Sequence, residues 1–184
     1  MILAPDLVAL IQAIHDAPPR LVYVFAGAGS LALHWLHAVP GSSRTLLEAR
    51  DCYAPRSLAA ILGGPPLQAV SVETANGMAT WAWRYAATLA ESPWPLLGVG
   101  CTAAIATDRA RRGADRAVVA ARLAGDTRIY ELFLDKERRD RAAEEELISR
   151  LVLLAIAEGC GAGQASLALG PEEALRVTHY PAPA

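Results

Sequence analysis

A strand, a glycine turn and a helix follow one another directly near the start of the chain. Residues 21–25 are an unbroken apolar run, Leu-Val-Tyr-Val-Phe, of the kind found in a strand that is covered on both faces. The turn Gly27-Ala28-Gly29-Ser30 comes next, and residues 31–39 are apolar and compatible with a helix. Because a strand buried on both faces needs two covering layers, this unit predicts a sheet with helices on both sides.

The rest of the chain continues the alternation of helices and strands. Further helices are expected near residues 7–17, 55–62, 72–89 and 136–157, and further strands at 45–53, 96–102, 117–123 and 128–134. The glycine-containing joint at residues 124–127 predicts a hairpin between the last two strands. We therefore expect an α/β fold, a three-layer α/β/α sandwich with a mixed sheet of about five strands.

The length of 184 residues favours a single domain, which we place at residues 1–160. Residues 161–184 break the rhythm of helices and strands, with several Gly and Pro and one helical hint at 171–175. This tail is either a docked extension or a linker.

Composition excludes several classes of protein. Hydrophobic residues make up 53% and charged residues 20% of the chain, which excludes intrinsic disorder. A net charge of -2 disfavours binding to nucleic acid. The apolar runs are far shorter than the roughly 20 residues of a membrane helix, and the start of the chain lacks the basic residues of a signal peptide. We expect a cytoplasmic protein with no membrane partner, whose three cysteines are reduced.

The glycine turn itself is open to three interpretations. Residues 27–32 fit G-x-G-x-x-A, and Glu48 and Asp51 follow about twenty residues later, as a dinucleotide-binding fold requires. A simpler phosphate site at the start of the helix uses the same glycines. A turn that serves packing alone would look no different.

Two charged segments follow. Residues 107–116 contain four arginines beyond the strand that ends near Thr102, where α/β sheets bind ligands, and are either an anion site or a solvated loop. The second segment joins residues 136–141 to Glu144, Glu145 and Glu146. We expect it to be a solvent-exposed helix surface with pairs Lys136–Asp140 and Arg141–Glu145.

No metal or other cofactor is expected. His34 and His37 have a spacing that can place two imidazoles on one helix face, but no third ligand accompanies them. Ser30, Ser42 and Ser43 are nucleophiles by residue type only, because no G-x-S-x-G motif surrounds them.

Several motifs occur in the order and spacing of one family. Val-Pro-Gly-Ser-Ser-Arg at 39–44 resembles its V-P-G-S-S, and residues 53–63 keep the length of its Y-S-N-x-x-K-x-x-L-L-G. Residues 70–79 are similar to its V-S-x-E-x-A-x-x-M-A, and 101–107 stand in the place of its V-T-G-I-A-G-P. The family that these motifs resemble is the C-terminal domain of the competence-damage-inducible protein A family, CinA. Its active members are nicotinamide-nucleotide amidases. Residues 98–113 most resemble the CinA-like domain that some eukaryotes fuse to a nucleotidyltransferase.

The resemblance implies a pocket for a pyridine mononucleotide near the glycine turn, the end of the second strand and the arginine-rich loop. It also implies possible association into a homo-oligomer. The ligand-binding residues expected from it are Gly27, Gly29, Ser30, Ser42, Ser43, Tyr53, Thr102, Arg109, Arg111 and Arg112.

The chain departs from the family at two decisive positions. Ungapped alignment puts Ala26 at the family's nucleophilic serine and Leu58 at its lysine. Neither side chain can attack or activate an amide. Three hypotheses remain. The chain is a non-catalytic nucleotide-binding protein, a hydrolase that uses rearranged residues, or a Rossmann-type dinucleotide binder. The candidates for rearranged catalysis are Ser30, Ser42, Tyr53 and Thr102.

Overall fold

The structure is a computed structural model that describes residues 3–108, 113–136, 138–163 and 165–181. Within these residues, five α-helices, one 3-10 helix and six strands follow one another. In chain order they are α1 Pro5–Asp16, β1 Arg20–Ala26, α2 Ser30–Ala38, η1 Ser42–Arg44, β2 Leu46–Asp51, α3 Pro55–Leu62, α4 Val72–Leu89, β3 Leu96–Ala104, β4 Arg116–Arg122, β5 Asp126–Phe133, α5 Arg141–Cys160 and β6 Ala174–Pro181.

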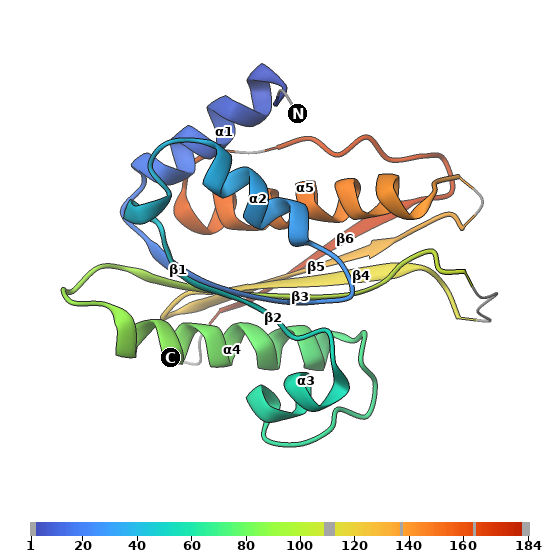
Figure 1. Ribbon diagram of the computed structural model, residues 1–184, viewed down its shortest axis with the longest axis horizontal. Helices are drawn as coiled ribbons and strands as arrows, with labels where there is room; N and C mark the ends of the chain where they lie inside the picture. Colours follow the sequence, from blue (N-terminus) through green and yellow to red (C-terminus); the bar gives the residue numbers. More distant parts are fainter. Residues whose placement is uncertain (1–2, 109–112, 137, 164, 182–184) are drawn as a thin grey trace.

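All six strands join one mixed sheet in the order β2-β1-β3-β4-β5-β6. β1 pairs in parallel with β2 and β3, while β4, β5 and β6 add on as antiparallel neighbours. The chain leaves β1 through α2 on one face and reaches β3 through α4 on the other (Figure 1). The strand order therefore reverses at β1, and the carboxyl ends of β1 and β3 form a switch point of the kind where open α/β sheets bind ligands.

Helices cover the sheet on both faces, which confirms the three-layer prediction. α1, α2 and α5 lie on one side, and α3 and α4 on the other (Figure 1). α4 approaches β3 closely because two strand residues lack side chains: a Cβ on Gly98 would lie 2.1 Å from the Ala79 carbonyl oxygen, and one on Gly100 2.5 Å from that of Ala75. None of the described helices is long and apolar enough to cross a membrane.

Most predicted elements are confirmed, including α3 and α4 at the expected residues and the hairpin between β4 and β5. The predicted start of the last helix is wrong. α5 begins at Arg141 rather than at Lys136. The Asp140 side chain accepts a hydrogen bond from the Ala143 N–H at 2.8 Å, so Asp140 is the N-cap and the helix starts after it. The expected helical pair Lys136–Asp140 is therefore wrong as well, since both residues precede the helix.

The C-terminal tail is docked as a sixth strand, so the sheet has six strands rather than about five. β6 pairs antiparallel with β5 along its whole length. The helical hint at residues 171–175 is wrong, because the chain turns there and enters β6. Glu173, with its side chain fully buried, accepts a hydrogen bond from the Gly170 N–H at 2.6 Å and forms an ion pair with Arg139. These contacts join the tail to the segment before α5.

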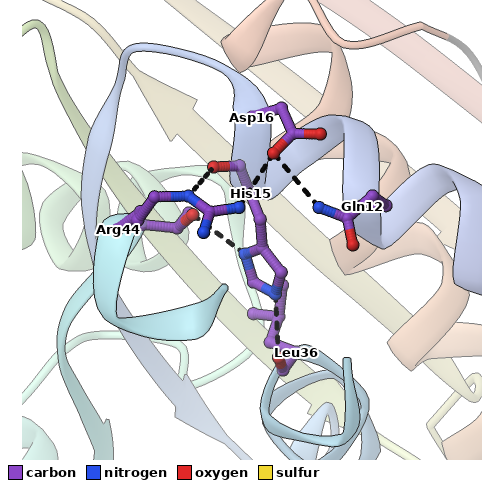
Figure 2. Close-up of polar contacts among 6 residues, drawn as sticks. Gln12, His15, Asp16, Leu36 and Arg44 are labelled. Atoms are coloured by element: carbon purple, nitrogen blue, oxygen red, sulfur yellow. Dashed lines mark hydrogen bonds and ion pairs between the residues drawn. The ribbon is translucent and has the colours of Figure 1, made fainter. Parts of the chain in front are cut away.

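A buried histidine, His15, joins α1 to Leu36 of α2 (Figure 2) and also to Thr45, the residue before β2. His15 Nε2 lies 2.9 Å from the Leu36 carbonyl oxygen, and Nδ1 lies 2.9 Å from Thr45 Oγ1. Since a carbonyl only accepts, Nε2 carries the proton and Nδ1 accepts from the threonine hydroxyl. Arg44 donates to the His15 carbonyl at 3.2 Å and to Asp16 at 2.8 Å. Burial is the main cause that lowers the pKa of His15, so the ring is neutral.

Candidate functional site

The turn between β1 and α2 is held in one conformation by its glycines and by a tyrosine beneath it. Gly27 and Gly29 have φ values of 90° and 106°, in the left-handed region that favours glycine. A Cβ on Gly29 would lie 2.3 Å from the Tyr23 hydroxyl oxygen, and this hydroxyl donates to the Gly29 carbonyl at 3.0 Å. The turn therefore has little freedom to accept a side chain at Gly29.

The carboxylate of Glu145, on α5, occupies the N-terminus of α2. Gly29 precedes α2 and has no side chain to accept from the free N–H groups of the first turn. The Gly29 N–H lies 3.0 Å from both oxygens of Glu145, and Oε1 also accepts from the Leu31 N–H at 3.1 Å and from the Ser30 hydroxyl at 3.0 Å. A negative charge at this helix end is favoured by the helix dipole. A residue 116 positions away thus caps α2.

The first turn of α5 is only in part the solvent-exposed surface that the sequence predicts. Glu145 binds the glycine turn instead of pairing with Arg141. Glu144 is buried and accepts from the Ala106 N–H at 2.6 Å, while Arg141 donates to the Ala106 carbonyl at 2.9 Å. Of the three consecutive glutamates, only Glu146 is exposed. The start of α5 therefore joins two loops at the carboxyl ends of β1 and β3.

A cavity of about 450 Å³ opens beside this junction, and we call it the switch-point cavity. It is lined by the ends of β1 and β3, by α3 and by the loops before α3 and α4. Most of the lining is apolar, and Tyr53, Thr102, Thr107 and Arg141 add polar groups. Ala26 and Leu58, the positions at which the resemblance to CinA places serine and lysine, both line it. Its size is within the range of small-molecule sites.

A second cavity, also of about 450 Å³, adjoins the first, and we call it the turn cavity. Gly27, Tyr53 and Arg141 line both cavities. The carboxylates of Asp51 and Glu145 belong to the turn cavity only, as does Ser30. The turn cavity is therefore the acidic part of the site, and the switch-point cavity is the apolar part.

The structure brings together five of the residues expected to bind a ligand. Gly27, Ser30, Tyr53 and Thr102 line one or both cavities, and Gly29 lies in the turn between them and α2. Tyr53 is 69% exposed. Thr102 is buried, and its hydroxyl donates to the Ala69 carbonyl at 2.7 Å.

The structure separates Ser42 and Ser43 from this group. Both lie in η1, which precedes β2, so they are at the amino ends of the parallel strands, opposite the cavities. Ser42 Oγ lies 3.0 Å from His37 Nδ1, and the Ser43 carbonyl accepts from Arg20 at 3.0 Å. In the part of the chain that the structure describes, no three His, Cys, Asp or Glu side chains gather to hold a metal ion. The remaining expected residues, Arg109, Arg111 and Arg112, lie outside the described residues.

Two protonatable groups beneath the turn stay neutral. The Cys101 thiol donates to the Ala28 carbonyl at a distance of 3.6 Å. Burial, and then the nearby carboxylate of Glu145, raises the pKa of Cys101. Burial first, then Cys101 and Glu145, raises the pKa of Tyr23. Neither group is therefore an activated nucleophile, and the negative charge of Glu145 contributes to the raised pKa of both.

The chain is an α/β/α protein, because helices cover its six-stranded sheet on both faces. The cavities at the switch point have the size and position of a small-molecule binding site. A scan against protein-family models and a search of curated protein sequences find no match.

Solved structures do match. A competence/damage inducible protein from Agrobacterium tumefaciens is similar with a TM-score of 0.62 and 19% identity, over 86% of this chain and 99% of that one. A CinA superfamily protein from Escherichia coli gives a TM-score of 0.65 and 17% identity, over 86% and 94% of the two chains. One from Klebsiella pneumoniae gives 0.63 and 14%, over 86% and 98%.

The chain therefore has the CinA fold, and the resemblance found in the sequence is confirmed at the level of fold. The link to domains fused with eukaryotic nucleotidyltransferases, the cytoplasmic location and the homo-oligomer stay predictions.

Proposed function

We propose that the chain is a non-catalytic, CinA-like binding protein whose switch-point cavity takes a pyridine nucleoside or mononucleotide. One observation carries the proposal: Ala26 and Leu58 line the cavity at the positions where the resemblance places the nucleophile and the lysine. A methyl group and an isobutyl group can neither attack an amide nor move a proton. The cavity volume of about 450 Å³ still suits a small ligand, so the chain can bind a ligand although it lacks the groups for the amidase reaction.

Two of the candidate hydroxyls, on Thr102 and Ser42, do not replace the missing serine. The Thr102 hydroxyl is 2.7 Å from the Ala69 carbonyl and donates its proton there, and a carbonyl oxygen is not a base that could remove that proton. Ser42 lies at the opposite end of the sheet. These contacts support loss of the amidase reaction rather than its transfer to Thr102 or Ser42.

Isothermal titration with nicotinamide mononucleotide, its deamidated acid form, nicotinamide riboside and NAD tests the proposal. An ammonia-release assay follows on each compound that binds. We expect binding of a nucleoside-sized or mononucleotide-sized compound and no ammonia above the buffer rate. Ala26→Leu, which fills the cavity from β1, should abolish the heat of binding, whereas Ala38→Leu on the exposed end of α2 should not. If none of the compounds binds, the proposal is wrong.

A hydrolase with rearranged residues is the second candidate, and one contact favours it. Ser30 lines the turn cavity, and its hydroxyl donates to Glu145 Oε1 at 3.0 Å. A hydroxyl beside a carboxylate acceptor is an arrangement that nucleophilic catalysis can use. Ammonia release that is abolished by Ser30→Ala and kept by Ser42→Ala would establish this function in place of the first.

A Rossmann-type dinucleotide site has less support. Three of the five strand pairings are antiparallel, and Glu145 fills the helix end where a pyrophosphate would lie. Glu48, one of the two acids considered for the ribose, accepts a hydrogen bond from Arg50 at 2.7 Å. The titration with NAD tests this alternative directly.

A further inference from the structure

We infer that Glu145 determines ligand specificity by filling the anion site of the glycine turn with its own carboxylate, so that the cavities take a nucleoside-sized ligand without a phosphate group. The ligand part of this inference rests on the proposed function. The part that concerns the anion site does not, and it is tested separately below.

The groups that Glu145 uses are those that a phosphate would need. Free N–H groups at the start of a helix, together with a serine hydroxyl, are a common phosphate-binding arrangement. Here the N–H groups of Gly29 and Leu31 and the hydroxyl of Ser30 all lie within 3.1 Å of the carboxylate. A phosphate could reach them only by displacing Glu145.

Contacts of α5 oppose displacement of the Glu145 carboxylate. Ser149, one turn later in α5, donates to Oε1 at 3.2 Å. The neighbouring residue Glu144 is buried and bonded to the Ala106 N–H, and Arg141 is bonded to the Ala106 carbonyl. These contacts fix the first turn of α5 against the sheet, so the carboxylate stays at the N-terminus of α2.

Charge acts in the same direction as geometry. Asp51 and Glu145 both line the turn cavity, against the single guanidinium of Arg141 among the lining residues that the structure describes. Two carboxylates next to a dianionic phosphate are repulsive at this short range, whereas a neutral or cationic ring system meets no such repulsion. The end of the ligand that lies against Gly27 and Ser30 is therefore not a phosphate.

The first experiment uses inorganic phosphate and needs no organic ligand. Thermal unfolding is followed with increasing phosphate, at ionic strength held constant with chloride, for the wild-type protein, Glu145→Ala and Glu146→Ala. Glu146 is the matched control, because it is the next residue, carries the same charge and is exposed. We expect phosphate to raise the unfolding temperature of Glu145→Ala only. A rise in the wild-type protein, or no rise in Glu145→Ala, overturns the inference.

A second variant covers the case in which Glu145→Ala does not fold. Glu145→Gln removes the charge and keeps an oxygen that accepts from the N–H groups of α2. It should show a smaller phosphate-dependent rise than Glu145→Ala, because the neutral amide still occupies the N–H groups but no longer repels phosphate. No rise in a folded Glu145→Gln would count against the inference.

The second experiment compares nicotinamide riboside with nicotinamide mononucleotide, which differ by one phosphate. We expect the wild-type protein and Glu146→Ala to bind the riboside about tenfold or more tightly than the mononucleotide, because the phosphate meets Glu145. Glu145→Ala should lose this preference. Equal affinities in the wild-type protein overturn the inference and leave the proposed function intact. Binding of neither compound overturns the proposed function, and the phosphate experiment then decides the role of Glu145.

Discussion

The glycine turn and the switch-point cavity are neighbours at the carboxyl ends of the strands, yet they are built in opposite ways. In the turn, the polar groups of Gly29, Ser30 and Leu31 all find a partner in Glu145. In the cavity, Ala26 and Leu58 face open space and offer no polar group. The turn carries the motif that suggests a ligand but is satisfied from within the chain. The cavity carries no such motif but has the room for a ligand.

The comparison predicts that the turn tolerates substitution worst. Gly29→Ala should reduce the free energy of unfolding by about 3 kcal/mol, because it combines an unfavourable φ with a contact of 2.3 Å to the Tyr23 hydroxyl. Gly63→Ala is the matched control, with a φ of 79° and no atom within 4 Å of the new Cβ. It should cost about 1 kcal/mol. Urea denaturation measures both changes.

A double variant separates the two causes. In a Tyr23→Phe background the hydroxyl is gone, so Gly29→Ala should cost less than it does in the wild-type protein. Equal costs for Gly29→Ala in the two backgrounds would show that the contact with Tyr23 does not hold the turn.

Loss of the capping carboxylate should have the next largest effect. Glu145→Ala is expected to lower the free energy of unfolding by about 2 kcal/mol, because several donors at the start of α2 lose their acceptor. Glu146→Ala breaks only an exposed pair with Arg150 and should cost less than about 0.5 kcal/mol. Similar losses in the two variants, measured by urea denaturation, would mean that the cap on α2 adds little to stability.

The cavity should tolerate an added polar atom. Ala26→Ser places a hydroxyl at the edge of open space, so we expect a change below about 1 kcal/mol. Ala32→Ser, at a fully buried position of α2, is the contrasting variant and should cost about 2 kcal/mol. If Ala26→Ser proves as costly as Ala32→Ser in the same assay, the cavity is closed in solution.

The smallest effect concerns pH and lies at the other end of the sheet, at His15. Its pKa is lowered from 6.5 by burial, so the unfolded chain binds a proton that the folded protein does not. The free energy of unfolding should therefore fall slightly as the pH decreases through about 6.5, with a slope of less than one proton. His15→Gln should flatten that part of the profile, whereas His34→Gln, at an exposed position, should leave it unchanged. A profile that keeps its slope in His15→Gln assigns the titration to another group.

Local patterns in the sequence predict most of the secondary structure. α3 and α4 are found at the expected residues because Pro55 in the first turn of α3 and the Ser71 cap of α4 mark their starts. The start of α5 is misplaced although a signal exists, since Asp140 precedes the periodic apolar residues as an N-cap does. β6 is missed for another reason. It lies at the edge of the sheet with most of its residues exposed, and only residues 175–178 alternate between apolar and polar side chains, which is a short signal for a strand.

The sequence indicates that α2 lacks a cap of its own, but it does not indicate that Glu145 supplies one. A glycine before α2, where Ser, Thr, Asp or Asn would supply a cap, indicates that an acceptor must come from elsewhere. Nothing near residue 145 says that it is the acceptor. Its spacing from Arg141 favours an ordinary surface pair, which is the interpretation that the structure overturns.

The sequence by itself predicts most of the helices, the buried strands and the CinA-like order of motifs, because each depends on residues close together in the chain. The loss of the serine and the lysine is a proposal that rests on the same resemblance. The tertiary structure alone decides that Glu145 caps α2, that Ser42 and Ser43 lie far from Gly27, and that the tail completes the sheet. These are contacts between distant segments, and their energies depend on how the helices pack against the sheet. The short-range periodicity of the sequence does not predict that packing.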